Sequence, residues 1–273
     1  MEARGARLGL WASGAVVAIV LAVGIVAPFV AYDPSDAVNY EEQLLGPSAA
    51  HWLGTDGQGR DIAMRLLKGT EAFFMPGLAA AAVATVFGAL AGAVTGYVGG
   101  PLRSVVLGLL QLVDTLPRLV FIILVCTILN PSIYLIAGVA AVLFVPNIAT
   151  VVRRKVEALA SDDYILAHIA HGFSAPRILL YHILWLQCRP LLIRQATYVF
   201  GYVLFVETAL SYLGDYGVQE PTPSWGNMVA QTRELAGQAP WPWLFPAVAI
   251  VLTISGFLAF GNLLARREEE AVR

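Results

Sequence analysis

Long apolar stretches constrain this chain more than any other feature of its sequence. A helix needs roughly 20 apolar residues to cross a hydrocarbon core about 30 Å thick. The chain has 273 residues, of which 58% are hydrophobic and only 13% are charged, whereas soluble domains carry nearer a quarter charged residues. The sequence therefore predicts an all-α integral membrane protein with six transmembrane helices, surrounded by membrane lipid.

The apolar runs place the six predicted crossings along the chain. They extend from the N-terminal region to about Ala31, from Phe74 to Val98, from Leu102 to Leu129, from Ile133 to Val152, from Leu191 to Val206 and from Trp241 to Leu264. The first run is too long for the apolar core of a secretory signal, so we expect it to be retained. In the second, Gly88, Gly92 and Gly96 repeat at a spacing of four and would let a neighbouring helix approach closely. Asp114 and Pro117 interrupt the third.

The distribution of charge predicts an orientation. Arginine and lysine are more frequent in the segments that are inside if the N-terminus is cytoplasmic, so the positive-inside rule places both termini in the cytoplasm. We divide the chain into residues 1–72, an N-terminal transmembrane helix with an external loop, and residues 73–273, a core transmembrane domain containing a cytoplasmic loop at 153–189.

That cytoplasmic loop is the longest polar interruption of the apolar pattern. Tyr164, Ala167 and His168 fall on a short helical pattern that Gly172 can end in a left-handed conformation. Ser161, Asp162 and Asp163 would cap its start, and a second short helix after Pro176 would carry Arg177 and His182. Such a helix can fit a groove on a soluble partner, although a solvated interfacial helix without a partner has the same pattern.

Two acidic residues lie where charge is costly in lipid. Asp114 in the third crossing and Glu207 at the end of the fifth should face the protein interior, an aqueous path or another helix. In a transporter they are candidates for pore or gate residues. For Asp114, an ion pair with Arg118 four residues later is an equally open reading.

Other site chemistries lack their required residues. The loop GTDGQGRD is rich in Gly and Asp but matches neither a nucleotide-binding nor a calcium-binding pattern. His168 and His171 lie one turn apart without the further ligands of a zinc site, so we expect no metal. Every histidine lies outside the crossings, which argues against an intramembrane enzyme, and we expect no nucleic-acid partner.

Three separated blocks resemble one known family. The blocks are HWLGTDGQGRDIAMRLLKG (51–69), YILAHIAHGFSAPRILLYHIL (164–184) and ETALSYLGDYGVQEPTPSWGNMV (207–229). They are similar to motifs of the inner-membrane permease subunits of ATP-binding-cassette importers for dipeptides, oligopeptides and nickel, of the DppC/OppC-like type. The chain departs from the family's pattern at His168, where a small residue is usual, and at Trp185, where proline is expected.

The resemblance implies a type I importer permease in the bacterial cytoplasmic (inner) membrane. Its partners would be a second homologous permease in a heterodimer, two ATPase subunits that hold ATP and Mg, and an extracytoplasmic solute-binding protein. The chain itself would bind no cofactor and catalyse nothing. It would import short peptides, peptide-like solutes or metal chelates by alternating access.

The resemblance also assigns roles to residues. Tyr164, Ala167, His168, Gly172, Arg177 and His182 would couple the chain to the ATPases. The external loop would be formed by Gly54, Asp56, Gly59, Arg60, Asp61, Trp225 and Gly226. The alternative is a secondary carrier or channel that works without ATPases, of which broken midplane helices are typical; Pro117 hints at one such break.

Overall fold

The chain forms a bundle of long helices in a computed structural model that describes residues 2–33, 37–129, 132–160, 162–214 and 216–272. The α-helices are α1 (Glu2–Val26), α2 (Ile62–Gly69), α3 (Glu71–Tyr97), α4 (Pro101–Asp114), α5 (Arg118–Ile128), α6 (Ile133–Ala160), α7 (Asp163–Ala170), α8 (Ala175–Arg177), α9 (Arg189–Leu213), α10 (Trp225–Thr232) and α11 (Trp241–Val272). Short 3₁₀ segments are η1 (Ala27–Phe29), η2 (Tyr40–Glu42) and η4 (Arg233–Leu235), and η3 (Ile178–Trp185) is a π-helical segment. The described ranges contain no β-strand, so the all-α prediction is confirmed.

Five helical stretches are long and apolar enough to cross a membrane. They are Arg7–Phe29, Ile62–Tyr97, Ile133–Ala160, Arg189–Leu213 and Trp241–Glu268. A sixth crossing exists if α4 and α5 together count as one, because a bend of 78° separates them. The break falls between Asp114 and Arg118, as predicted, and Pro117 stands as the N-cap of α5. The predicted interruption of the third crossing is thus present, and the count of six crossings stays a prediction.

Several helices are longer than the crossings predicted from hydropathy. α6 continues through the three cations after Val152 to Ala160, and an ion pair between Arg153 and Glu157 supports this extension. α9 continues past Glu207 to Leu213. Arginine, lysine and glutamate favour helix as strongly as most apolar residues do, so hydropathy marks where the apolar run ends and not where the helix ends.

The glycines of α3 allow its close packing against α6. A Cβ atom at Gly88 would lie 2.6 Å from the Ile148 side chain, and one at Gly92 would lie 2.5 Å from the Ala149 carbonyl oxygen. Gly96 is equally tight against Val156. The predicted close approach at these glycines is confirmed.

α1 and α11 pack against each other on the other side of the bundle. A Cβ atom at Gly256 would lie 2.6 Å from Val16. The predicted boundary between residues 1–72 and 73–273 falls inside the apolar stretch Ile62–Tyr97. This division of the chain stays a prediction.

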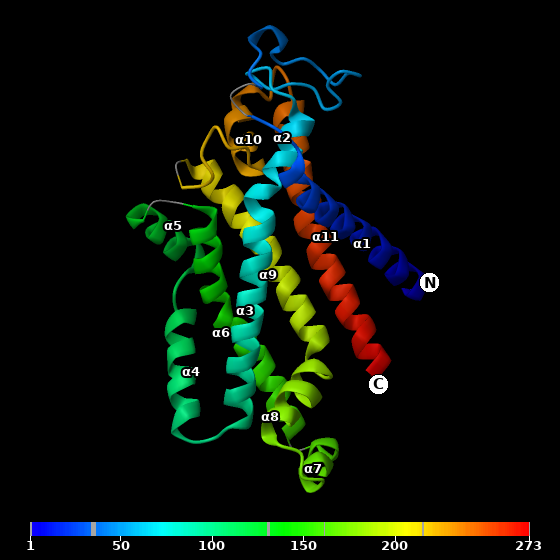
Figure 1. Ribbon diagram of the computed structural model, residues 1–273, viewed down its shortest axis with the longest axis vertical. Coiled ribbons are helices and arrows are strands. Elements are labelled where there is room, and N and C mark those ends of the chain that lie inside the picture. The colour runs from blue at the N-terminus through cyan, green and yellow to red at the C-terminus, as the bar shows by residue number, and fades with distance from the viewer. Residues whose placement is uncertain (1, 34–36, 130–131, 161, 215, 273) are drawn as a thin grey trace.

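The two predicted functional loops lie at opposite ends of the bundle. α2, α10 and the loop before α2 gather at one end, and α7 and α8 form the other (Figure 1). From the α2 end, α1 and α11 lead back to the two termini, which lie on the side toward α7. The long helices therefore connect two polar ends of the molecule.

Candidate functional site

The loop before α2 folds around two glycines in the left-handed region. Gly54 has φ 81° and Gly59 has φ 75°, and a Cβ atom at Gly59 would lie 1.7 Å from the Asn39 carbonyl oxygen. The Asn39 amide donates to the Gln58 carbonyl at 3.0 Å. Both predicted glycines are thus needed for a tight turn that holds the preceding segment.

Asp56 lies at the centre of this turn and accepts four hydrogen bonds. The backbone amides of Gln58 and Arg60 donate to it at 2.8 and 3.1 Å, the Arg60 Nε at 2.8 Å, and the Arg65 guanidinium also binds it. Burial alone would raise the pKa of Asp56, but the charges of Arg65 and Arg60 outweigh it and lower the pKa below its ordinary value. The Gly- and Asp-rich loop therefore uses its central carboxylate to bind the protein's own arginines.

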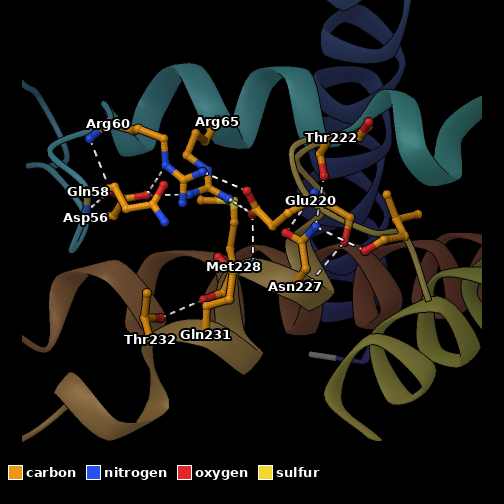
Figure 2. A network of polar contacts seen from close by, with 12 residues as sticks. Asp56, Gln58, Arg60, Arg65, Glu220, Thr222, Asn227, Met228, Gln231 and Thr232 are labelled. Atoms are coloured by element: carbon orange, nitrogen blue, oxygen red, sulfur yellow. Dashed lines mark hydrogen bonds and ion pairs between the residues drawn. The ribbon is translucent and has the colours of Figure 1, made fainter. Parts of the chain in front are cut away.

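Glu220, between α9 and α10, completes the network shown in Figure 2. Arg60 Nη1 and Arg65 Nη2 each donate to it at 2.8 Å, and Gln231 donates at 2.7 Å. Burial again opposes ionisation, but Arg65 and its other donors lower the pKa of Glu220. Two arginines thus bridge two carboxylates and tie the loop before α2 to the segment that leads into α10.

Further contacts join the same two regions, which we call the α2–α10 junction (residues 54–69 and 220–231). The Trp225 indole donates to the Leu66 carbonyl at 2.8 Å. Asp61 caps α2 by accepting from the Met64 amide at 2.9 Å. At the start of α10, Ser224 and Asn227 form a capping box. The first and third sequence blocks thus form one structural unit.

The junction contains all seven residues predicted for the external loop: Gly54, Asp56, Gly59, Arg60, Asp61, Trp225 and Gly226. Sequence reasoning missed Arg65 and Glu220, although each belongs to one of the three blocks. The sequence offered one signal, a charged residue followed directly by two leucines. The structure shows that Arg65 is almost fully buried, which is rare for an arginine without a charged partner.

Glu207 lies directly beneath the junction, in α9, and is fully buried. Ser211 donates to one of its carboxylate oxygens at 2.8 Å. A Cβ atom at Gly226 would lie 2.9 Å from the other oxygen and 2.8 Å from the Thr208 backbone. Gly226 therefore allows α10 to sit against α9 at Glu207, and the gate role of Glu207 stays a prediction.

At the opposite side of the bundle, α7 begins and ends where the sequence predicts. Asp162 is its N-cap and accepts from the Tyr164 amide at 3.2 Å, whereas Ser161 lies outside the described residues. Gly172 has φ 77°. The amide of Phe173 donates to the His168 carbonyl and the amide of Gly172 to the Ile169 carbonyl, which is the hydrogen-bond pattern of a Schellman cap.

Beyond Gly172 the chain turns back and packs on α7 through aromatic and histidine rings. The rings of His168 and His182 have centroids 4.1 Å apart, and the Tyr164 hydroxyl lies 3.1 Å from His182 Nδ1. Arg177 stacks on Phe173 at 4.6 Å. His168, which occupies a position where a small residue is usual, thus forms part of the contact between α7 and η3.

His182 is buried in this cluster and its Nε2 has no hydrogen-bond partner among the described residues. Burial lowers its pKa, as do the nearby His168 and Arg177. Ala167 accepts a hydrogen bond from the His171 ring, and Tyr164, Leu166 and Ile169 remain exposed. The six residues predicted for coupling therefore lie in one compact loop, with an apolar exposed face.

Asp114 lies apart from both ends, at the break between α4 and α5. Arg118 approaches it at 3.6 Å, as the ion-pair reading predicts. Asp114 ends α4, whereas Glu207 is buried between α9 and α10, and the described residues show no contact between the two side chains. The structure does not bring the two predicted pore residues together.

Comparison with known proteins gives a family model and a set of similar chains. The model of the binding-protein-dependent transport system inner membrane component matches residues 84–270. The dipeptide transport system permease protein DppC of Alkalihalophilus pseudofirmus is 34% identical over 88% of this chain and 78% of its own length. The oligopeptide transport system permease protein OppC of Bacillus subtilis is 31% identical over 90% of this chain and 80% of its own. The probable D,D-dipeptide transport system permease protein DdpC of Escherichia coli is 30% identical over 92% and 83%.

The helical bundle, its apolar crossings and the three blocks define a multi-pass membrane transport protein. More particularly, the chain belongs to the family of binding-protein-dependent transport system inner membrane components. It is therefore a non-catalytic transport subunit of an inner membrane, and its family works together with other subunits.

Proposed function

We propose that this chain is one of two homologous permeases in an ATP-driven importer of dipeptides, oligopeptides or related solutes. Similar chains named for dipeptide and oligopeptide transport support the substrate class. In this proposal a solute-binding protein delivers the substrate at the α2–α10 junction. Two ATPase subunits, which hold ATP and Mg, act at the α7 end, where both termini also lie in the cytoplasm.

The observation that carries this proposal is the placement of the two loops at opposite ends of the long helices (Figure 1). α7 joins α6 to the η3–α9 segment, so a displacement of α7 acts on two crossings at once. The exposed apolar residues of α7, Leu166 and Ile169, suit a groove on a soluble subunit. ATP-driven closure of the ATPases would thus tilt α6 and α9 and reorient the pathway.

The test is to purify the complex from cells that express the chain with its neighbouring transport genes. Peptide-loaded binding protein should stimulate ATP hydrolysis by the intact complex. A chain lacking residues 162–182 should no longer retain the ATPases in a pull-down, while still co-purifying with the partner permease. Retention of the ATPases without α7 would refute the docking role.

The alternative, a carrier or channel that needs no ATPase, draws support from the 78° bend between α4 and α5. Peptide uptake that continues in proteoliposomes without ATP would favour it.

A further inference from the structure

Two opposite charges lie near the middle of the bent helix pair that spans Pro101–Ile128. Asp114 ends α4 and Arg118 begins α5. Charges at this depth are costly in lipid, and in membrane proteins they face a partner or a water-filled path. Glu207, the other acidic residue predicted to line the pore, is fully buried and so is closed to a solute.

The ion pair between these charges is loose. Arg118 Nη2 and Asp114 Oδ1 lie 3.6 Å apart, with 28% of the Arg118 side chain and 58% of the Asp114 side chain exposed. In the junction, by contrast, Arg60 approaches Asp56 at 2.8 Å and both side chains are 4% exposed. Neither the Asp114 nor the Arg118 side chain forms a hydrogen bond with another described residue. The donors of Arg118 and the acceptors of Asp114 are therefore available to a ligand from outside the chain.

The guanidinium packs on an aromatic ring of α6, and that ring packs in turn on two aromatic rings of α9. Arg118 lies over the ring of Phe144 at 4.4 Å, and Phe144 meets Tyr202 at 4.8 Å and Tyr198 at 5.6 Å. Tyr198, Tyr202 and Phe205 recur at the spacing of one helical face on α9. Tyr198 is 43% exposed and Phe205 49% exposed. We call Asp114, Arg118, Tyr198, Tyr202 and Phe205 the charged aromatic patch.

We propose that the charged aromatic patch is a substrate contact in the translocation path, which recognises the free termini of a short peptide. This inference rests on the proposed peptide-import function. Arg118 offers paired donors for the terminal carboxylate, Asp114 offers an acceptor for the terminal ammonium, and the exposed rings offer contact to peptide side chains. A zwitterionic peptide complements the patch in charge, whereas lipid tails do not.

The bend explains how the two charges can act on one ligand. Asp114 and Arg118 belong to separate helices with an angle of 78° between them, so their separation changes when the crossings tilt. A peptide placed between them would replace their weak contact with two charge-assisted ones. Closing the pair again would release the peptide, which a transport path requires.

The first test is uptake of radiolabelled Ala-Phe by the complete complex in proteoliposomes with saturating binding protein. Arg118→Gln and Asp114→Asn should each lower the initial rate at least tenfold. The exchanged variant, with Asp114→Arg and Arg118→Asp, should stay as slow as the single variants. Uptake restored by the exchange would show a purely structural ion pair and would overturn the proposal, as would unchanged uptake in both single variants.

The second test does not require the charge variants to fold. A p-benzoylphenylalanine residue replaces Phe205 and, as a matched control, the exposed Tyr134 of α6. Illumination during ATP-driven turnover should attach labelled Ala-Phe to this chain at position 205 at least five times more than at 134. Equal or absent labelling would overturn the proposal. If the wild-type complex takes up no Ala-Phe at all, the proposed function fails instead.

Discussion

Arg65 is among the largest side chains that the fold buries completely, and both carboxylates that it binds lie outside its own helix. An arginine can do this because its planar guanidinium presents several donors in a fixed geometry. Through it, α2 is held to the loop that precedes it and to Glu220. Arg65 thus joins the first and third blocks. In the sequence alone it cannot be told apart from the other charged residues of the external segment.

Replacing Arg65 with methionine should destabilise the protein severely. The change leaves Asp56 with one arginine fewer in a buried site, and breaking a buried pair from one side costs about 3–5 kcal/mol. The midpoint of thermal unfolding in detergent measures the loss. Arg233→Met is the matched control, because Arg233 is exposed and its side chain stacks on Tyr212 without an ion pair to any described residue. Equal midpoints for the two variants would contradict the assigned role of Arg65.

His182 makes the α7–η3 loop sensitive to pH. Its pKa in the folded loop is lower than the ordinary value of 6.5, so it stays neutral there while an unfolded histidine takes up a proton. The loop is therefore most stable above about pH 6.5 and loses stability as the pH falls below that value. The groups that face His182 are Tyr164 and His168 from α7, Arg177 from α8 and Tyr181 from its own segment, η3.

Amide hydrogen exchange between pH 8 and 5.5 checks this dependence, with rates corrected for intrinsic pH effects. Protection of residues 163–185 should decrease as the pH falls in the wild-type chain. In His182→Phe the decrease should be smaller, because one of the two packed histidines is gone. The same decrease in both chains would show that His182 is not responsible.

Among the elements, α3 and α6 make the most extensive contact in the bundle, and three glycines set their separation. Gly92→Ala should destabilise the chain by about 1–3 kcal/mol, because its Cβ atom would meet the Ala149 carbonyl. Gly138→Ala in α6 is the control, since no atom lies within 4 Å of its Cβ position. There alanine should be neutral or slightly stabilising. Chemical unfolding in detergent compares the two variants, and equal stabilities would refute the close-packing account.

Local chemistry made several elements predictable from sequence. The small residues of α3, the cap at Gly172 and the break at Pro117 each follow from the residue itself or its near neighbours. The partnership of Arg65 with Glu220 could not be predicted, because 155 residues separate the two. The contact between His168 and His182 depends on how far the chain folds back after Gly172. The angle of 78° between α4 and α5 could not be predicted either, because hydropathy locates a break but contains no angle.

Over the whole molecule, the long helices connect an end held by buried ion pairs to an end held mainly by ring contacts. The α2–α10 junction is held by buried charge-assisted hydrogen bonds, which are stronger than neutral ones. The α7 end is held by ring contacts, a contact between the Tyr164 hydroxyl and His182, and caps at both ends of α7, with an exposed apolar face. In the proposed importer the α2–α10 junction binds the solute-binding protein without rearranging, and the α7 end moves with the ATPases.

ATP-driven peptide uptake by the reconstituted complex tests this account most directly. Proteoliposomes that contain the two permeases and two ATPases receive peptide-loaded binding protein outside and ATP inside. We predict labelled peptide accumulating above its external concentration with the wild-type chain, and no accumulation without ATP or with residues 162–182 deleted. Accumulation that persists without ATP, or that survives the deletion, would contradict the account.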